Sequence, residues 1–302
     1  MIKVSIILTT YNSGHQIIEV INSIKNQDGV NKKFEMELIV VDDCSTDNTI
    51  ELLKSNNIPF ISTKSNSGGP NQGRNIALRE CKGDFICIAD HDDIWFSNRI
   101  LELLRVSDLA PIISSGYTLF DITNNKKIER ANRCADSFVL YNENSTFISK
   151  LIRSKIGQQT YLGSIMFSSS LKHILFEEEY GMIDYDWVLK IFHNNSSVEI
   201  CRSLYLKKVE GTNLSLDENY RINDYNYSLK IVSEFSNLYP SEVKISKKRI
   251  NGSMGRYYYL MGEMKNARKY LFKSEITFVN ILYLITTFAG NKFVRKHFNI
   301  FG

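Results

Sequence analysis

The chain has 302 residues, 43% of them apolar, which is enough to bury a full hydrophobic core. Its net charge of +4 hides an asymmetry, because residues 244–302 carry 12 Lys and Arg against 2 Asp and Glu, a net of +10, whereas residues 1–243 carry 25 against 31, a net of −6. No run of 18 apolar residues occurs, which excludes a clear membrane-spanning helix.

The first 110 residues alternate between two apolar patterns. Short apolar runs predict strands that are buried on both faces of a parallel sheet, and apolar residues at helical spacing predict the helices between them. Such repeats imply right-handed crossovers and therefore an α/β fold with a doubly wound, mostly parallel sheet. The predicted strands are residues 4–8, 36–41, 60–61 and 84–89. The predicted helices are residues 17–24, 71–80 and 100–104, and a further helix that Ser45 or Thr46 caps and that runs through Leu53.

The rest of the chain is mixed up to about residue 209 and helical beyond Asp217. The predicted elements are a hairpin over 116–129, a strand over 163–168, a helix over 184–192, a strand over 204–209 and a helix-turn-helix over 257–271. We place a first domain at 1–212, with halves at about 1–110 and 111–212, and a basic helical extension at 213–302.

Cysteine usage and the N-terminus bear on the cellular compartment. The five cysteines are an odd number, with no Cys-x-x-Cys pair and no His at zinc-ligand spacing, so we expect reduced thiols and not a disulfide framework. Residues 1–5 enter a strand pattern directly and leave no room for a signal peptide. We therefore expect a cytoplasmic protein.

Each polar cluster of interest follows a predicted strand. Ligands of open α/β sheets bind at the carboxyl ends of the strands, so clusters far apart in sequence converge along one edge. The clusters are Thr9-Thr10-Tyr11-Asn12, Asp42-Asp43, Asn66 to Asn75 and Asp90 to Asp93.

The segment Asp90-His91-Asp92-Asp93 places three carboxylates within four residues. Like charges at this range repel, which indicates a bound cation. Mg²⁺ or Mn²⁺ held by one or two carboxylates and by phosphate oxygens is the usual solution. The alternative is a solvated acidic turn in which Asp93 caps the next helix. If the segment stays extended, His91 points away from Asp90 and Asp92, which leaves it a supporting role at best.

The other clusters also admit two interpretations. Asp42 or Asp43 can accept the N–H of a nucleotide base while Tyr11 stacks on its face, or either can cap a helix entry. In Asn66–Asn75 the glycines allow close backbone approach and Arg74 can hold a phosphate or a base edge, although such loops often only turn the chain.

Two further segments carry open alternatives. Asp184 and Asp186 stand at a predicted helix entry, where a carboxylate can serve as a general base or merely as an N-cap. Residues 276–290 are apolar and flanked by basic residues, which fits a helix in the interface of an anionic membrane or a core or dimer helix. No recognised nucleic-acid motif accompanies the positive charge, so we expect no nucleic-acid partner.

Four of these segments together closely resemble the family 2 inverting glycosyltransferases in order and spacing. The match is close over residues 1 to about 105 and looser to about 210. It implies a nucleotide-diphospho-sugar transferase fold of the GT-A-like type. The segments are Val4–Asn12, Leu38–Asp47, Asn66–Asn75 and Ala89–Trp95.

The resemblance also implies site roles. Asp90-His91-Asp92 looks like the Asp-x-Asp element of the family, with Asp92 as the leading ligand of Mn²⁺ or Mg²⁺ and Asp90 directed toward the ribose or the metal. Ile183–Trp187 is similar to a Glu-Asp motif whose Asp is the catalytic base. Ile183 replaces the Glu, so Asp184 is the first choice and Asp186 the reserve. The implied nucleotide-sugar-binding residues are Thr9, Tyr11, Asn12, one of Asp42 or Asp43, Gly69, Arg74, Asp90 and His91.

The implied activity is metal-dependent, inverting transfer of a hexose or N-acetylhexosamine from a nucleotide-diphospho-sugar, with a UDP-sugar favoured. The acceptor is a hydroxyl of a saccharide or lipid-linked oligosaccharide, in bacterial capsule or O-antigen synthesis, and the basic tail gives an option of peripheral membrane contact. The alternative is a catalytically inactive nucleotide-sugar-binding module of a membrane-associated assembly, which the replacement at Ile183 favours.

Overall fold

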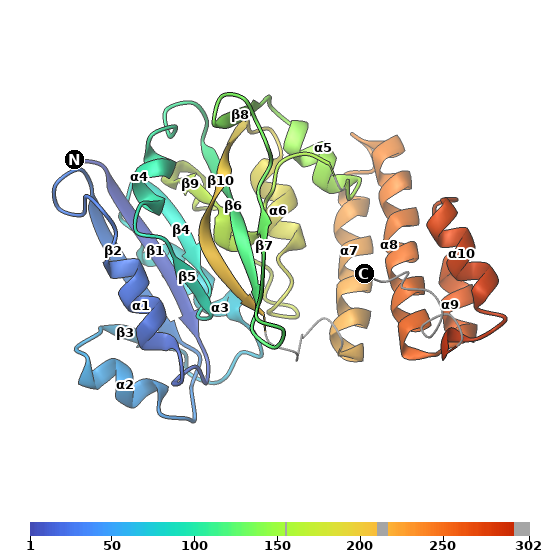
Figure 1. Ribbon diagram of the computed structural model, residues 1–302, viewed down its shortest axis with the longest axis horizontal. Coiled ribbons are helices and arrows are strands. Elements are labelled where there is room, and N and C mark those ends of the chain that lie inside the picture. The colour runs from blue at the N-terminus through green and yellow to red at the C-terminus, as the bar shows by residue number, and fades with distance from the viewer. Residues whose placement is uncertain (155, 210–216, 293–302) are drawn as a thin grey trace. The chain divides into compact units, whose positions relative to one another are not determined.

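The computed structural model describes residues 1–154, 156–209 and 217–292 (Figure 1). The chain divides into two compact units. The first consists of Met1–Phe147 with Ile156–Asn213 and contains a mixed β-sheet. The second consists of Ile148–Lys155 with Leu214–Gly302 and is helical wherever it is described beyond residue 217, apart from its connections.

The N-terminal part of the sheet is parallel, in the order β3-β2-β1-β4. Alternate side chains of β1 face opposite sides: Val4, Ile6 and Leu8 join the core that contains the apolar stripe of α1, whereas Thr9 lies under Gly73 of α3. The strands are β1 (Lys3–Thr10), β2 (Glu35–Asp42), β3 (Phe60–Ser62) and β4 (Phe85–Ala89), and the helices are α1 (Ile17–Lys25), α2 (Thr49–Ser55) and α3 (Pro70–Glu80).

Beyond β4 the sheet becomes mixed. The short strand β9 is antiparallel to both β4 and β6, β6 runs parallel to β10, and β10 pairs antiparallel with β5 and β8. The remaining elements of this unit are β5 (Asp93–Trp95), α4 (Arg99–Leu104), β6 (Ile112–Asp121), β7 (Lys126–Arg130), β8 (Phe138–Tyr141), the start of α5 (Ser145–Leu151) up to Phe147, β9 (Met166–Ser168), α6 (Tyr185–Phe192) and β10 (Ser197–Val209), with 3₁₀ turns at Leu162–Ser164 and Ser169–Leu171.

The predicted α/β class is confirmed, with a sheet that is mixed where a mostly parallel one was expected. The hairpin over 116–129 is confirmed as β6 and β7. The cap expected for α2 is wrong: the helix begins after Asn48, and the N–H of Thr49 is taken by the Asp47 carboxylate at 2.9 Å. The Ser45 hydroxyl is occupied instead by Asp42.

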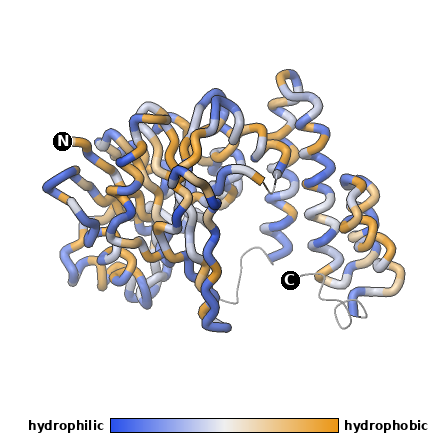
Figure 2. Tube along the Cα trace, turned by 45° about the horizontal axis from the view of Figure 1, so that its top comes forward, coloured by the Kyte–Doolittle hydropathy of each residue, from blue (hydrophilic) through white to orange (hydrophobic). Residues whose placement is uncertain are grey.

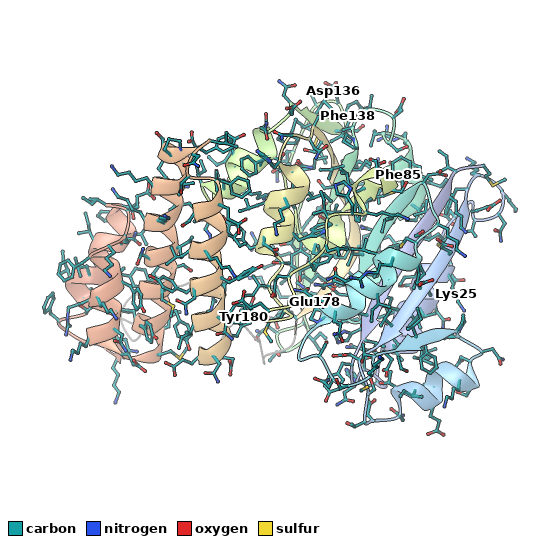
Figure 3. All side chains as sticks on the ribbon, turned by 180° about the vertical axis from the view of Figure 1, so that it is seen from behind. Lys25, Phe85, Asp136, Phe138, Glu178 and Tyr180 are labelled. Carbon is teal, nitrogen blue, oxygen red and sulfur yellow. A yellow bond between two sulfur atoms is a disulfide. The ribbon has the colours of Figure 1, made fainter. Side chains whose placement is uncertain are left out.

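The expectation that all cysteines are reduced is also wrong. Cys134 and Cys201 form a disulfide with a Cα–Cα distance of 6.0 Å. The antiparallel pairing of β8 with β10 brings the two together, since the N–H of Cys201 donates to the carbonyl of Ser137 at 2.9 Å. Asp136 and Phe138 mark this segment in Figure 3.

The other three cysteines, Cys44, Cys81 and Cys87, are free. Burial raises the pKa of the Cys81 thiol to about 11 and that of Cys87 to about 12, so both are held as unreactive thiols.

The second unit is built on helices rich in tyrosine. Its core joins Tyr257, Tyr258 and Tyr259 with Ala267, Leu271 and Tyr283. Gly262, at φ +86°, ends α8 in the left-handed conformation, and its N–H and that of Glu263 satisfy the last carbonyls of the helix, which makes the predicted helix-turn-helix. The helices are α7 (Glu218–Glu234), α8 (Pro240–Met261), α9 (Met264–Leu271) and α10 (Phe278–Thr286).

Among the described residues, no helix has the length and apolarity that crossing a bilayer requires.

Candidate active site

The acidic segment after β4 forms a turn. The N–H of Asp93 approaches the carbonyl of Asp90 at 3.3 Å, and β5 starts at Asp93. The segment is therefore not extended, so the condition under which we expected His91 to point away from Asp90 and Asp92 is not met. Asp90, His91 and Asp92 are half-buried at this turn, whereas the side chain of Asp93 is fully buried.

Arg74 of α3 reaches this turn from a different part of the sequence. Its guanidinium donates to Asp90 Oδ1 at 2.9 Å and to Asn71 Oδ1 at 3.1 Å, and it lies over the ring of Phe176. Burial acts to raise the pKa of Asp90, but the charges of Arg74, Lys207 and His91 outweigh it, so the pKa lies below its ordinary value. Asp90 is thus an ionised carboxylate that already has a cationic partner.

Asp93 behaves in the opposite way. Neither of its carboxyl oxygens has a hydrogen-bond partner among the described residues. Burial, followed by the charge of Asp90, raises its pKa well above the ordinary value, although Lys207 acts against this. The sequence-level alternative in which Asp93 caps the next helix is wrong, since α4 begins after Asn98.

The residues after β1 and β2 hold each other in place. Asn12, at φ 48°, accepts the N–H of Thr46 at 2.7 Å on its side-chain oxygen and donates its own N–H to Ser45. Thr9 is buried, and Tyr11 is 43% exposed beside it in sequence. An exposed ring on an anchored loop leaves its face open to a planar group.

Asp42 and Asp43 are both buried and engaged by protein donors. Asp42 accepts from the N–H and the hydroxyl of Ser45 at 3.1 and 2.5 Å. Asp43 accepts from the hydroxyl of Thr63 at 2.8 Å and from the N–H and the hydroxyl of Ser67. Asp42 therefore closes a local turn, and Asp43 anchors the loop that leads to α3.

Gly69 ends that loop against another segment of the chain. A Cβ atom on Gly69 would lie 2.2 Å from the carbonyl oxygen of Gly181, and the N–H of Asn71 donates to that same oxygen at 3.0 Å. The close backbone approach expected of this glycine is thus made, in this structure, to residue 181.

Glu177 is a buried carboxylate that the sequence analysis missed. Its Oε2 accepts the N–H of Tyr180 at 2.7 Å and that of Gly181 at 3.3 Å. Its Oε1 accepts the N–H groups of Met182 and Ile183 at 3.1 and 2.8 Å, together with the side-chain amide of Asn71. In sequence it stands in a run of three glutamates that reads as a solvated acidic turn, so no local pattern marks it.

Asp184 and Asp186, two residues apart at the start of α6, have different surroundings. Asp184 is half-buried at the N-cap of α6. Asp186 is fully buried and pairs with Lys190 at 3.2 Å on the same helix. Burial raises the pKa of Asp186, against the effect of Lys190.

The Tyr161 hydroxyl is influenced by the charges of Asp184 and of the acidic turn. Burial raises the pKa of the Tyr161 hydroxyl, and the negative charges of Asp90, Asp93, Asp184 and Asp92 add to that effect. Hydrogen bonds connect the same two parts of the site: Arg74 donates to Asp90 and to Asn71, and the side-chain amide of Asn71 donates to the carbonyl of Ile183 at 3.0 Å. The acidic turn and the residue directly before Asp184 are therefore held by neighbouring side chains of α3.

Lys207 of β10 was also missed. Its ammonium contacts the hydroxyl of Tyr161 and lies 3.9 Å from the centre of that ring. Its positive charge helps to lower the pKa of Asp90 and opposes the rise in the pKa of Asp93. Only the pairing of β5 with β10 places it opposite Asp93, and this long-range register has no signature in the local sequence.

A metal ion fits part of this arrangement. Among the described residues no three His, Cys, Asp or Glu side chains form a metal cage. Mg²⁺ and Mn²⁺ need no such cage when substrate phosphates supply the remaining ligands. The half-buried Asp92, next to the paired Asp90, fits this second kind of site.

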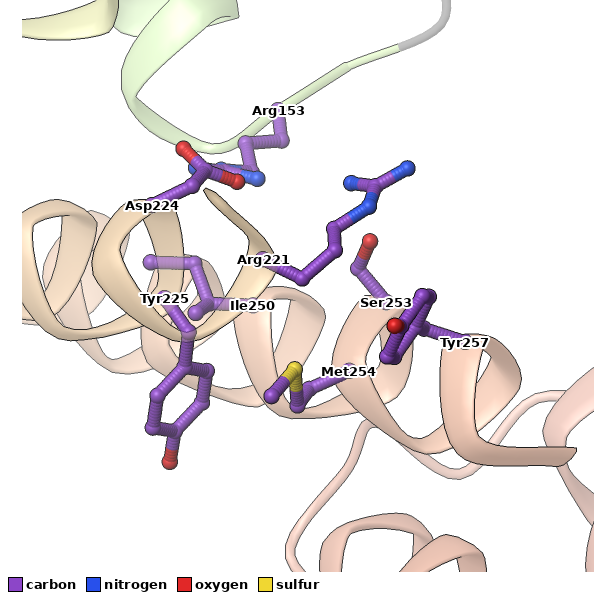
Figure 4. A pocket seen from close by; sticks show the side chains of 8 residues that line it. All are labelled: Arg153, Arg221, Asp224, Tyr225, Ile250, Ser253, Met254 and Tyr257. Carbon is purple, nitrogen blue, oxygen red and sulfur yellow. The ribbon is translucent and has the colours of Figure 1, made fainter. Parts of the chain in front are cut away.

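A small pocket in the helical unit holds none of the predicted site residues. It has room for roughly one water molecule. Its lining, shown in Figure 4, consists of Arg153, Arg221, Asp224, Tyr225, Ile250, Ser253, Met254 and Tyr257.

Comparisons with known proteins agree with this geometry. The chain is similar to the poly(ribitol-phosphate) β-N-acetylglucosaminyltransferase TarS of Staphylococcus aureus, with 42% identity over 97 residues, 31% of this chain and 17% of TarS. It is also 38% identical over 127 residues to WfgD of Escherichia coli, a UDP-Glc:α-D-GlcNAc-diphosphoundecaprenol β-1,3-glucosyltransferase, covering 41% of this chain and 48% of WfgD. The chain thus spans less than half of the length of these relatives.

Solved structures show the same fold. The crystal structure of TarS 1–349 matches 94% of this chain and 80% of its own length, with a TM-score of 0.65 and 20% identity, and the same protein with UDP-GlcNAc matches with a TM-score of 0.58. The mannosyltransferase PcManGT of Pyrobaculum calidifontis, in complex with GDP-Man and Mn²⁺, matches 95% of this chain and 79% of its own length, with a TM-score of 0.55 and 15% identity.

The family model described as "Glycosyl transferase family 2" matches residues 5–175, more than half of the chain. This range contains the sheet edge, the acidic turn and Arg74. With the fold shared with TarS, it confirms the resemblance seen in the sequence motifs: the chain belongs to glycosyl transferase family 2.

Proposed function

We propose that this chain transfers a sugar from a nucleotide-diphospho-sugar to an acceptor hydroxyl with inversion at the anomeric carbon. The observation that carries the proposal is the chain of hydrogen bonds that runs from Asp90 through Arg74 and Asn71 to the carbonyl of Ile183, the residue before Asp184. A displacement of this kind needs a charge-neutralising site for the diphosphate and a separate base for the attacking hydroxyl.

In this proposal Asp184 is the base. It is half-buried at a helix entry, whereas the carboxylate of Asp186 is buried and held by Lys190. Asp184 takes the proton of the acceptor hydroxyl, whose oxygen attacks the anomeric carbon as the bond to the diphosphate breaks. A single displacement of this geometry inverts the configuration.

On the donor side we propose roles for the strand-end residues. Thr9, Tyr11, Asn12 and one of Asp42 or Asp43 form the base site, and Gly69 and Arg74 support it. Asp92, with Asp90 and His91 beside it, is proposed to hold Mn²⁺ or Mg²⁺, which when bound neutralises the departing diphosphate. A UDP-sugar is the favoured donor, because TarS has been solved with UDP-GlcNAc and WfgD is named for UDP-Glc.

The acceptor and the setting are proposed from the relatives. WfgD acts on a sugar linked to diphosphoundecaprenol and TarS on poly(ribitol-phosphate). We propose a saccharide or lipid-linked oligosaccharide acceptor in bacterial surface-polysaccharide synthesis, such as capsule or O-antigen. Residues 1–212 would act as the transferase domain at the cytoplasmic face of the membrane and residues 213–302 as its extension.

Release of UDP from UDP-GlcNAc and UDP-glucose, with Mn²⁺ present, tests the base assignment. Asp184→Asn should lower the rate by at least about a hundredfold, because a positioned base contributes that much, and should leave thermal unfolding unchanged. Asp186→Asn should keep most of the rate. If Asp184→Asn is fully active and Asp186→Asn is not, the assignment of the base is wrong.

A second candidate function is a nucleotide-sugar-binding module without transfer. The specific observation in its favour is Ile183, a buried apolar residue directly before Asp184. Under this alternative the wild-type chain binds a UDP-sugar, shows no turnover with any saccharide acceptor, and neither aspartate variant alters UDP release.

A further inference from the structure

Helix α10 buries its polar side. Asn280, Tyr283 and Thr287, three and four residues apart, are 7%, 6% and 2% exposed and face the second unit's interior. Asn280 accepts from Arg256 and donates to the carbonyl of Glu275, both at 2.8 Å. Tyr283 packs edge-on against Tyr259. The inward side of this helix is thus fixed by hydrogen bonds and aromatic contacts.

The opposite side of α10 and its flanks is apolar and exposed. Phe278, Ile281, Ile285 and Phe288 follow one another at spacings of three, four and three, and they are 76%, 42%, 61% and 74% exposed. This spacing defines one helical face, which we call the α10 face. The helix itself contains no charged residue, and the hydrophobic stretch is visible along its trace in Figure 2. A helix of a globular unit normally turns its apolar side inward, so this inverted arrangement indicates an external apolar partner.

A positive charge lies at one end of the α10 face, and further basic residues lie on the neighbouring helix α9. The guanidinium of Arg268 on α9 lies 4.9 Å from the ring centre of Phe288 and donates to the carbonyl of Thr287. Lys265, Lys269 and Lys273 are exposed on and just after the same helix α9. Because residues 244–302 carry only two acidic residues against twelve basic ones, the partner must tolerate a strongly positive neighbour.

These observations distinguish between two possible apolar partners, a second copy of this chain and a lipid bilayer. A second copy of this chain would bring two positive surfaces together, which is unfavourable. A bilayer of anionic lipid offers apolar chains to the phenylalanines and negative headgroups to the lysines. We propose that the α10 face docks on an anionic lipid surface, with the axis of the helix in the plane of the interface.

Co-sedimentation of the full chain with lipid vesicles tests this. The chain should bind vesicles of phosphatidylglycerol mixed with phosphatidylcholine, should bind vesicles of phosphatidylcholine alone at least about tenfold more weakly, and should dissociate as salt is raised. The triple variant Phe278→Ser, Ile285→Ser, Phe288→Ser should lose at least about tenfold in affinity. Lys265→Gln, Lys269→Gln, Lys273→Gln should weaken binding to the anionic vesicles only.

A control variant removes three exposed apolar residues elsewhere, with Leu109→Ser, Leu140→Ser and Leu238→Ser. It should bind vesicles like the wild type.

Thermal unfolding without vesicles reports whether the α10 face is free, because substitutions of exposed side chains change the free energy of unfolding little. A large loss of stability in the phenylalanine variant, or concentration-dependent self-association without vesicle binding, would assign the face to the chain's own residues or to a second copy and overturn the proposal. Equal binding to both kinds of vesicle would overturn its electrostatic part. UDP binding is measured separately, so either proposal can fail alone.

Discussion

At the scale of single residues, the candidate site depends on buried groups that hold the exposed ones. Asp184 directly follows the loop of residues 180–183, so its position depends on how that loop is held. That loop is held by the carboxylate of Glu177, which takes four backbone N–H groups and the amide of Asn71. Since Asn71 lies on α3 together with Arg74, the same contact links the base to the side chain that pairs with Asp90.

Replacing Glu177 should therefore disturb Asp184 through its loop. In Glu177→Gln one acceptor oxygen becomes an NH₂ group that faces N–H donors, so at least two hydrogen bonds are lost at a cost of about 2 kcal/mol. We expect the kcat of UDP release to fall at least about tenfold with little change in the affinity for UDP. Steady-state kinetics and denaturant unfolding measure the two effects.

Glu178→Gln is the matched control. Glu178 is exposed and accepts a single side-chain bond from Asn75 at 2.7 Å, which an amide oxygen can still accept; it is labelled beside Tyr180 in Figure 3. The free energy of unfolding of Glu178→Gln should stay within about 0.5 kcal/mol of that of the wild type. Equal behaviour of the two variants would contradict the positioning role of Glu177.

At the scale of helices and strands, the spacing of apolar residues predicted the elements that depend on their own local sequence. The strand–helix alternation over the first 110 residues and the helical second unit follow from apolar periodicity, and both are confirmed. The pairing of β9 between β4 and β6, and of β5 with β10, joins segments far apart in sequence, so the mixed part of the sheet was not predictable. The pairing of β5 with β10 places Lys207 opposite Asp93, and Tyr161 contacts Lys207. The order of the motifs in the sequence pointed to Asp90, Asp92 and Asp184 as candidate site residues. The side chains around them, such as Lys207, could be identified only from the fold.

The disulfide belongs to this scale, because it links the segment before β8 to β10. Its two cysteines are 67 residues apart, a spacing without a recognised pattern. Under denaturing, non-reducing conditions three free thiols should titrate, and five after reduction. Removing the link with Cys134→Ser should lower the free energy of unfolding by roughly 4 kcal/mol in the chain-entropy model. Five thiols before reduction would show that the bond does not form in the purified protein.

At the scale of the whole molecule, two units of opposite charge suit two different tasks. The sheet-bearing unit is acidic and has its acids gathered at one strand edge, where a diphosphate with a metal ion would bind. The helical unit is basic and presents the apolar α10 face. Charge asymmetry was visible in the sequence, but the sequence left open whether residues 276–290 face a core, a dimer or a membrane. The exposure of Phe278, Ile285 and Phe288 decides against the core formed by the described residues of the helical unit.

The nucleotide-diphosphate site is tested most directly by thermal stabilisation of the purified chain by UDP, dTDP, GDP and CDP, each with and without Mn²⁺. One nucleotide should raise the Tm by several degrees when it is well above its Kd, and Mn²⁺ should enlarge the shift. Asp92→Ala should lose the contribution of Mn²⁺, whereas Asp108→Ala, which removes an exposed carboxylate after α4, should respond like the wild type. No shift with any nucleotide from a folded protein, or an undiminished effect of Mn²⁺ in Asp92→Ala, would contradict a nucleotide-diphosphate site at the acidic turn.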